Sequence, residues 1–161
     1  MKPSNSKFTK IQKSRLKTFV STQNTKFFGI PSFGDFCLFS CENGFLIDKH
    51  LEMGKKILKS FLGKHGLLWV VIFPNKSITK KPVGVRIGKG KGAVSNWVSP
   101  VYAGKVVFEI KNVTATMASQ AFQLVQKKLP LKTRWQARAN PLKTILYSIK
   151  SSAISVWIAQ W

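Results

Sequence analysis

The chain has 161 residues, of which 27 are Lys or Arg and only 5 are Asp or Glu, so its formal net charge is +22 at pH 7. A hydrophobic content of 44%, with 12 Phe and 5 Trp, can fill a core; this excludes a wholly disordered basic tail, and the length fits one compact domain with extensions. So many like charges oppose compaction, and the composition therefore indicates a polyanionic partner: nucleic acid first, an anionic membrane surface second.

The first 26 residues are predicted to form an extended basic arm. This segment is rich in Lys, Ser and Thr and contains no acidic residue, a composition that it shares with transit peptides. Because it has little Arg and no apolar face, we interpret it instead as an RNA-binding extension. Its candidate phosphate-binding residues are Lys7, Lys10, Lys13, Arg15 and Lys17.

A first helix is predicted to begin at Asp48, a favourable N-cap residue, and to end at Gly63 or Gly66. A short strand closed by a turn is expected before it, between residues 35 and 43. Apolar residues recur at helical spacing along residues 51–62. The lysines off that stripe form either a solvated face or a surface for RNA, and they are Lys55, Lys56 and Lys59.

The second half of the body is predicted to mix strands with one more helix. Residues 67–73 are a continuous apolar run, expected to be a central strand, and further strands are expected at 83–87, 97–101 and 105–111. Thr114 is predicted to cap a helix that turns Met117 and Phe122 inward and stops at Pro130. Strands and helices without regular alternation indicate an α+β fold.

Residues that carry catalytic or metal chemistry are few and dispersed. Cys37 and Cys41 are the only cysteines, and their spacing is expected to place both on one buried face of a strand. No other Cys or His pair completes a zinc site, and the five acidic residues include no close pair for acid–base work. We therefore predict no metal, no cofactor, no small-molecule substrate and no enzymatic activity.

The segment 136–161 is predicted to be a separate C-terminal extension, after an arm at 1–26 and an α+β domain at 27–135. Asn140 followed by Pro141 is a helix start signal, and an apolar stripe continues to residue 158. This helix is too short and too polar to span a bilayer, so we expect it to dock on the body or on a neighbour. Interfacial membrane binding is the alternative.

The most distinctive motif is the sequence R-I-G-K-G-K-G at residues 86–92. Its glycines permit unusual backbone angles and close approach, and its alternating lysines provide a row of charges that cannot pack in a core. A phosphate-binding Walker A loop would lead into a helix, whereas this motif precedes a strand-like run. We predict a projecting loop that contacts a phosphate backbone, with a merely solvated hairpin tip as the alternative.

Taken in chain order, these motifs resemble a known family. They are F-G at 33–34, W-V-V-I-F-P at 69–74, I-T-K-K-P at 78–82, V-R-I-G-K-G-K-G at 85–92 and K-L-P-L-K-T at 128–133. The resemblance spans residues 7–135 and is to the large-subunit ribosomal protein family called L-sixteen in bacteria and L-ten in eukaryotes.

The resemblance implies two helices packed on an antiparallel or mixed sheet, with a long Gly-Lys loop. It implies binding to large-subunit rRNA near the central protuberance, beside neighbouring ribosomal proteins, with the loop reaching toward the peptidyl-transferase centre to help seat A-site tRNA. It implies that Arg86 lies near that centre. It also implies that Lys89 and Lys91 make backbone contacts. The further predicted rRNA or tRNA contacts are Lys80, Lys81, Gly88, Gly90, Gly92 and Lys132.

Two departures from the family pattern bear on the origin of the chain. Lys55 and Lys56 stand where bacterial members carry arginines, and the tail from Asn140 has no counterpart in the short bacterial form. With the strong lysine bias, these features suggest a mitochondrial ribosome, a plastid or bacterial ribosome being the alternative. The alternative function is a non-ribosomal organellar RNA-binding protein, associated with a membrane through its C-terminal helix.

Overall fold

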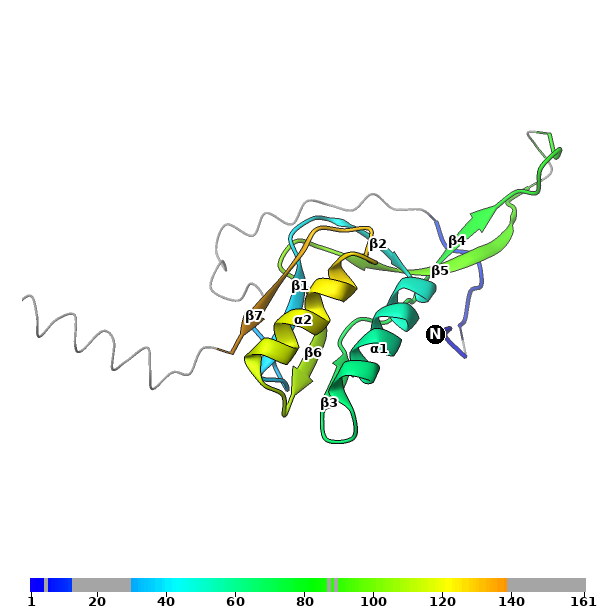
Figure 1. The fold of residues 1–161 in the computed structure, drawn as a ribbon. Helices are drawn as coiled ribbons and strands as arrows, with labels where there is room; N and C mark the ends of the chain where they lie inside the picture. Colours follow the sequence, from blue (N-terminus) through cyan, green and yellow to red (C-terminus); the bar gives the residue numbers. More distant parts are fainter. Residues whose placement is uncertain (5, 13–29, 87, 89, 139–161) are drawn as a thin grey trace, which may run out of the picture.

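The computed structural model describes residues 1–4, 6–12, 30–86, 88 and 90–138. In this part of the chain, two helices cover one face of a four-stranded antiparallel sheet, and a three-stranded antiparallel sheet extends from that body (Figure 1). The predicted α+β class is therefore confirmed, with two sheets where one was expected. The predicted C-terminal helix and the end of the basic arm lie outside the described residues.

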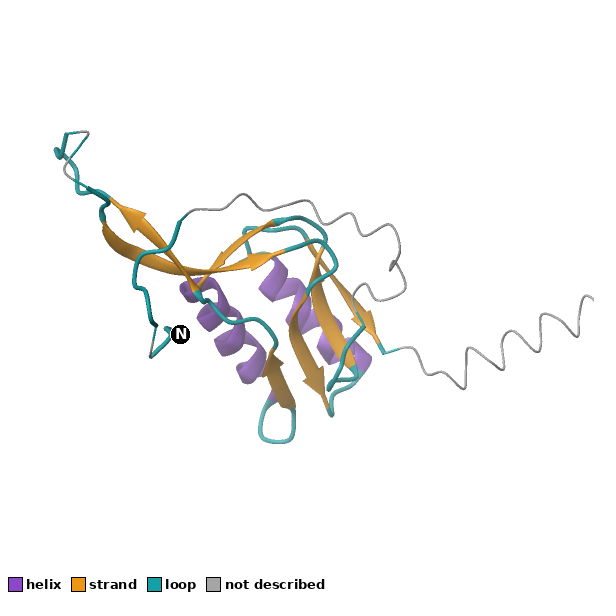
Figure 2. Cartoon of the chain, turned by 180° about the vertical axis from the view of Figure 1, so that it is seen from behind, coloured by secondary structure: helices purple, strands orange, loops and turns teal. Residues whose placement is uncertain are grey.

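The four-stranded sheet has the order β3-β6-β1-β7. Its strands are β1 (Phe36–Ser40), β3 (Leu67–Val70), β6 (Val106–Lys111) and β7 (Thr133–Ala137). Leu38 on β1 lies opposite Phe108 on β6 and Trp135 on β7, so these side chains share one face. That face meets the helices, and Figure 2 shows the strands lying in front of them when the molecule is seen from behind.

The helices are α1 (Asp48–Leu62) and α2 (Ala115–Gln126), which lie side by side on the sheet (Figure 1). Leu51 and Leu58 of α1 and Phe122 of α2 are fully buried in one core cluster with Phe108. Gly54 lets α1 approach the sheet closely, because a Cβ atom there would lie 2.7 Å from the Phe108 ring. The core is therefore set by close packing of helix against sheet.

The second sheet has the order β2-β5-β4 and carries the Gly-Lys loop. It consists of β2 (Gly44–Ile47), β4 (Lys76–Lys80) and the nine-residue β5 (Ala93–Val101). Residues 98–101 of β5 pair with β2, whereas residues 93–98 pair with β4. The β4–β5 hairpin therefore extends beyond β2 and holds its loop away from the body (Figures 1 and 2).

Two strand predictions are wrong. The apolar run 67–73 contains β3, which within the described residues is an edge strand paired with β6 alone, and Val71 and Phe73 beyond it are 44% and 49% exposed. Residues 83–86 contain a turn at Val83-Gly84 and no strand; β4 precedes them instead and ends before Pro82, whose missing N–H cannot extend a ladder.

Both helices form where the sequence predicts them, but the N-cap of the first and the buried face of the second differ from the prediction. Thr114 caps α2, its hydroxyl accepting from the backbone N–H of Met117 at 3.5 Å, but the Met117 side chain is 42% exposed. Asp48 is the first helical residue of α1 and not its N-cap, because β2 runs directly into the helix and Ile47 takes the cap position without a side-chain bond. Of the two predicted ends of this helix, Gly63 and Gly66, the structure has Gly63.

The two cysteines do not share a buried face as expected. Cys37 lies on the central strand β1 and is fully buried, whereas Cys41 follows that strand and is half-buried. They are not joined in a disulfide. The predicted boundary after residue 135 remains a prediction, although β7 continues to Ala137 and the N–H of Arg138 donates to the Asp35 carbonyl at 2.6 Å.

Candidate nucleic-acid interface

The loop at the tip of the β4–β5 hairpin is strongly cationic and open to solvent. Between positions 76 and 92 the sequence has five lysines, one arginine and no acidic residue. Lys80, Arg86 and Lys91 are all exposed, and Lys89 lies outside the described residues. The hairpin therefore presents concentrated positive charge at the point farthest from the core (Figure 1).

Backbone conformation explains three of the loop glycines. Gly84, Gly88 and Gly90 have φ angles of 86°, 113° and 83°, which residues with a side chain rarely adopt. A Cβ atom at any of the three would meet nothing within 4 Å inside the protein. These glycines are thus required by the path of the loop and not by packing against the rest of the chain.

Gly92 and Lys81 shape the base of the loop from within. A Cβ atom on Gly92 would lie 2.7 Å from the Lys80 carbonyl oxygen, so Gly92 lets the two sides of the hairpin approach. The Lys81 ammonium donates to the Gly88 carbonyl at 2.8 Å, across the loop. Both residues were predicted as RNA contacts, and both also have a structural role in the hairpin.

The basic arm lies against this loop, a contact that sequence reasoning missed. The Lys10 ammonium donates to the Lys91 carbonyl at 3.0 Å, and the Lys91 ammonium donates to the Ile11 carbonyl at 2.7 Å. Ile11 also lines a cavity of about 70 Å³ with Phe45 and Ile78. The structure therefore joins two predicted binding segments about 80 residues apart, and no local pattern in the sequence signals such a contact.

The start of the arm is held at α1. The Met1 amino group donates to the Glu52 carboxylate and lowers the pKa of that carboxyl. Lys7 lies 5.7 Å from the centre of the Phe8 ring and is exposed. The other predicted arm contacts, Lys13, Arg15 and Lys17, lie outside the described residues.

The predicted helix lysines do not all share one environment. Lys55, Lys56 and Lys59 are all exposed on α1. Lys56 lines a groove with Phe61 and with Leu124 of α2, whereas Lys55 and Lys59 lie outside that groove. The three lysines therefore do not form a single uniform surface.

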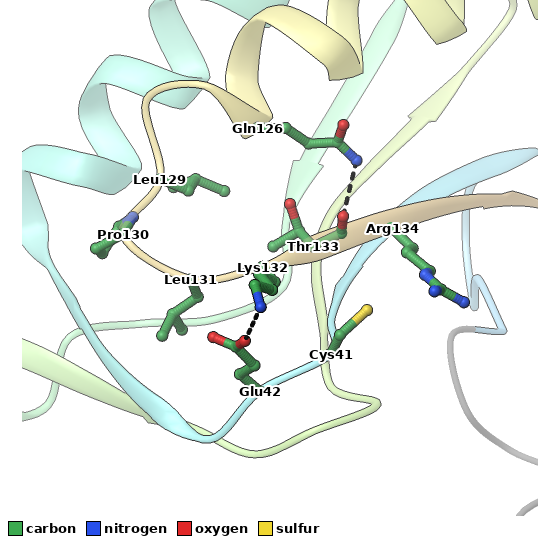
Figure 3. Close-up of a pocket in the computed structure, with 9 residues that line it drawn as sticks. All are labelled: Cys41, Glu42, Gln126, Leu129, Pro130, Leu131, Lys132, Thr133 and Arg134. Carbon is green, nitrogen blue, oxygen red and sulfur yellow. Dashed lines mark hydrogen bonds and ion pairs between the residues drawn. The ribbon is translucent and has the colours of Figure 1, made fainter.

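Lys132 lies on the body, in the turn between α2 and β7, away from the loop tip. Figure 3 shows it facing Glu42, with which it forms an ion pair at 3.4 Å, while Arg134 points away from this pair. The Gln126 side-chain amide donates to the Thr133 carbonyl at 3.0 Å and ties the turn to α2. The ion pair is exposed, so it leaves Lys132 accessible to a second anion.

Phe33 is a surface aromatic residue that the sequence did not single out as a candidate for binding. The residue is 63% exposed and its ring stacks on Trp69, with centroids 6.2 Å apart and planes at 26°. The backbone N–H groups of Ser32, Phe33 and Gly34 donate to the buried Glu109 carboxylate at 3.0, 2.7 and 2.8 Å and fix this position. Flat exposed aromatic surfaces of this kind stack on unpaired bases.

Trp135 is an aromatic side chain with a structural role. It packs against the core cluster and meets the Phe36 ring edge-on at 6.3 Å. Trp97 is half-buried on β5.

Within the residues that the structure describes, no three His, Cys, Asp or Glu side chains are grouped so as to hold a metal ion. None of the helices described here has the length and apolarity needed to cross a bilayer.

Comparison with known proteins agrees with this arrangement. Residues 3–136 match the family described as ribosomal protein L16p/L10e. The chain is 37% identical over 142 residues to large ribosomal subunit protein uL16 of Dehalococcoides mccartyi, a match that covers 88% of this chain and 92% of that protein. It is 40% identical over 132 residues to uL16 of Carsonella ruddii, covering 82% and 94%, and 36% identical over 138 residues to uL16c of Oltmannsiellopsis viridis, covering 86% and 99%. The chain therefore belongs to the L16p/L10e family of large-subunit ribosomal proteins.

Proposed function

We propose that this protein is a structural constituent of the large ribosomal subunit that binds rRNA through its arm and hairpin loop and helps position A-site tRNA. The observation that carries the proposal is the loop: five lysines and one arginine between residues 76 and 92, without an acidic residue, at the tip of a projecting hairpin. Such a loop contributes to affinity by neutralising phosphates and releasing their counterions.

The proposed contact surface has three parts. Arg86 and the glycines and lysines of 88–92 contact RNA at the loop tip, with Lys80 and Lys81 at its base. The arm lysines, together with Lys55 and Lys59, neutralise further phosphates, and Lys132 binds from the body. We leave Lys56 out of this surface because it lines the groove between the helices.

Arg86 is proposed to act near the peptidyl-transferase centre. Its guanidinium can bind a phosphate or a base edge with two parallel hydrogen bonds, which a lysine cannot do. Arg86 is exposed, and no hydrogen bond within the described residues holds its side chain against the protein. It is therefore available to RNA in the assembled particle.

The experiment compares Arg86→Ala with Lys64→Ala, an exposed residue in the turn after α1, in reconstituted large subunits. We expect Arg86→Ala to slow A-site tRNA accommodation about tenfold, with less than a twofold loss of incorporation into the subunit. Lys64→Ala should change neither. Equal losses of accommodation and incorporation would reduce Arg86 to a general phosphate contact and contradict the role in tRNA positioning.

We also propose that the ribosome in question is mitochondrial and that residues 136–161 dock on a neighbouring ribosomal protein. The lysine bias and the apolar stripe of that segment support these proposals. Cell fractionation of the tagged full chain tests the mitochondrial location, and cosedimentation with plastid or cytosolic ribosomes would contradict it. Removal of residues 139–161 tests the docking of the C-terminal segment on a neighbouring protein. Unchanged retention of the shortened chain on large subunits in high salt would contradict that docking.

A further inference from the structure

A groove between the two helices differs in chemistry from the loop. It has a volume of about 580 Å³ and lies where the second half of α1 meets the end of α2. Its apolar lining is Ile57, Phe61 and Leu124, and its basic lining is Lys56, Lys127 and Lys128. The loop, by contrast, consists mainly of glycine and charged side chains at its tip.

The apolar lining is left open to solvent. Phe61 is 36% exposed and Leu124 is 40% exposed, and Ile57 is only partly buried beside the core. Covering these side chains is favourable because it removes apolar surface from water. A phosphate backbone cannot supply that gain, since it would meet the lysines and leave the apolar lining uncovered.

Among the residues that the structure describes, no acidic side chain lines the groove. α2 carries no acidic residue, and Glu109 is the last acidic residue in the sequence. On α1, Glu52 binds the Met1 amino group. The segment 139–161 contains two lysines and no acid, so it would leave the groove lysines unpaired if it occupied this site.

We propose that this groove binds an acidic amphipathic helix of a partner protein. Apolar side chains spaced i, i+3 or i+4, and i+7 along that helix cover Ile57, Phe61 and Leu124, while carboxylates on its flanks pair with the three lysines. This inference goes beyond the RNA contacts proposed above and depends on residues that they do not use. Charge complementarity and the exposed apolar lining both favour this occupant.

The first test uses the full chain and three probes: a synthetic helix with Leu at those spacings and Glu elsewhere, polyglutamate of the same length, and an RNA oligonucleotide. We expect the Leu–Glu helix to bind at least tenfold more tightly than polyglutamate at physiological salt. The double variant Lys127→Glu, Lys128→Glu should weaken that binding about tenfold. The matched double variant Lys49→Glu, Lys64→Glu, at exposed lysines outside the groove, should weaken it less than twofold.

Equal binding of polyglutamate would mean that only net charge attracts the peptide, and it would overturn the proposal. The same holds if the two double variants lose affinity equally, or if RNA competes fully with the Leu–Glu helix through Lys127 and Lys128. Circular dichroism of each variant confirms that the substituted proteins are folded.

The second test places a photo-crosslinking phenylalanine derivative at Leu124 or at Met117 in chains assembled into large subunits. The two positions lie on the same helix and are 40% and 42% exposed, but Met117 is outside the groove. We expect position 124 alone to crosslink to an acidic helical stretch of another protein, and the Lys127→Glu, Lys128→Glu variant to lose that product. Crosslinks to RNA, to residues 139–161 or to nothing would overturn the proposal while leaving the Arg86 experiment unaffected.

Discussion

The helix-covered sheet and the hairpin loop hold their residues in place by different physical means. In the body, Leu38, Phe108 and Phe122 are fully buried, and a single added carbon at Gly54 would collide with the Phe108 ring. In the loop, a Cβ atom at Gly88 would meet nothing within 4 Å. The positions of the loop residues depend instead on backbone angles and on hydrogen bonds from lysine side chains to backbone carbonyls. Substitutions in the body should therefore change folding stability, whereas those in the loop should change binding.

The strongest test of this comparison is Glu109→Ala. This carboxylate is 1% exposed and accepts three backbone N–H groups, so its loss leaves three donors without their partner. We expect the free energy of unfolding in urea to fall by roughly 3 kcal/mol. Glu42→Ala, which removes only the exposed pair with Lys132, is the control and should cost less than about 1 kcal/mol. Equal effects would show that the buried carboxylate does not secure the segment 32–34.

Gly54→Val against Gly88→Val compares the two regions directly. In α1, the added side chain overlaps Phe108 Cζ at 2.7 Å, and overpacking of this kind costs about 1–3 kcal/mol. In the loop, strain at a φ of 113° alters only the local path, so the global unfolding midpoint should hardly move while incorporation into the large subunit fails. Normal assembly of the Gly88→Val protein would contradict the requirement for this backbone path.

The buried cysteine gives a pH-dependent effect confined to the body. Burial raises the pKa of the Cys37 thiol from its usual 9.0 to about 12, and the charge of Glu109 adds to the shift. The folded pKa exceeds the unfolded one, so this stabilisation is complete below pH 9 and is lost as the pH rises from about 9 to 12. Between pH 9 and 10 the wild type should lose about 1 kcal/mol more than Cys37→Ala in urea unfolding. Parallel pH profiles for the two proteins would count against a buried thiol.

The smallest expected effect is on the loop itself. Lys81→Met removes the hydrogen bond to the Gly88 carbonyl, which is exposed to solvent, and should change global stability by less than about 0.5 kcal/mol. Amide hydrogen exchange in the peptide 82–91 should nevertheless become faster. Lys80→Met, at a neighbouring exposed lysine, serves as the control. Unchanged exchange in Lys81→Met would mean that the backbone angles alone hold the loop.

Local signals in the sequence predicted the parts of the fold that local chemistry controls. The Thr114 cap, the end of α1 at Gly63 and the projecting Gly-Lys loop were all found from neighbouring residues. Edge and central strands could not be told apart, because the run 67–73 is apolar on both faces even though one face stays partly exposed. The pairing of β3 with β6 decides whether the strand is central or at the edge, and such pairing joins residues that are far apart in the sequence.

The same limit applies to the candidate site. The charged loop residues were identified from composition, but the contact between Lys10 and Lys91 joins positions 81 residues apart. The groove was missed because the helical stripe around Phe61 looked like core, and only the position of α2 leaves that face uncovered. Such features depend on how elements meet in space.

The Glu109 carboxylate also sets an order of events during synthesis. The amides that it accepts precede it by 75 to 77 positions, so residues 32–34 have no acceptor until most of the domain has left the ribosome that makes it. The junction between the arm and the body therefore lacks this one anchor until residue 109 has been added. The segment 32–34 of a newly made chain is therefore expected to reach its folded position only after Glu109 has been added.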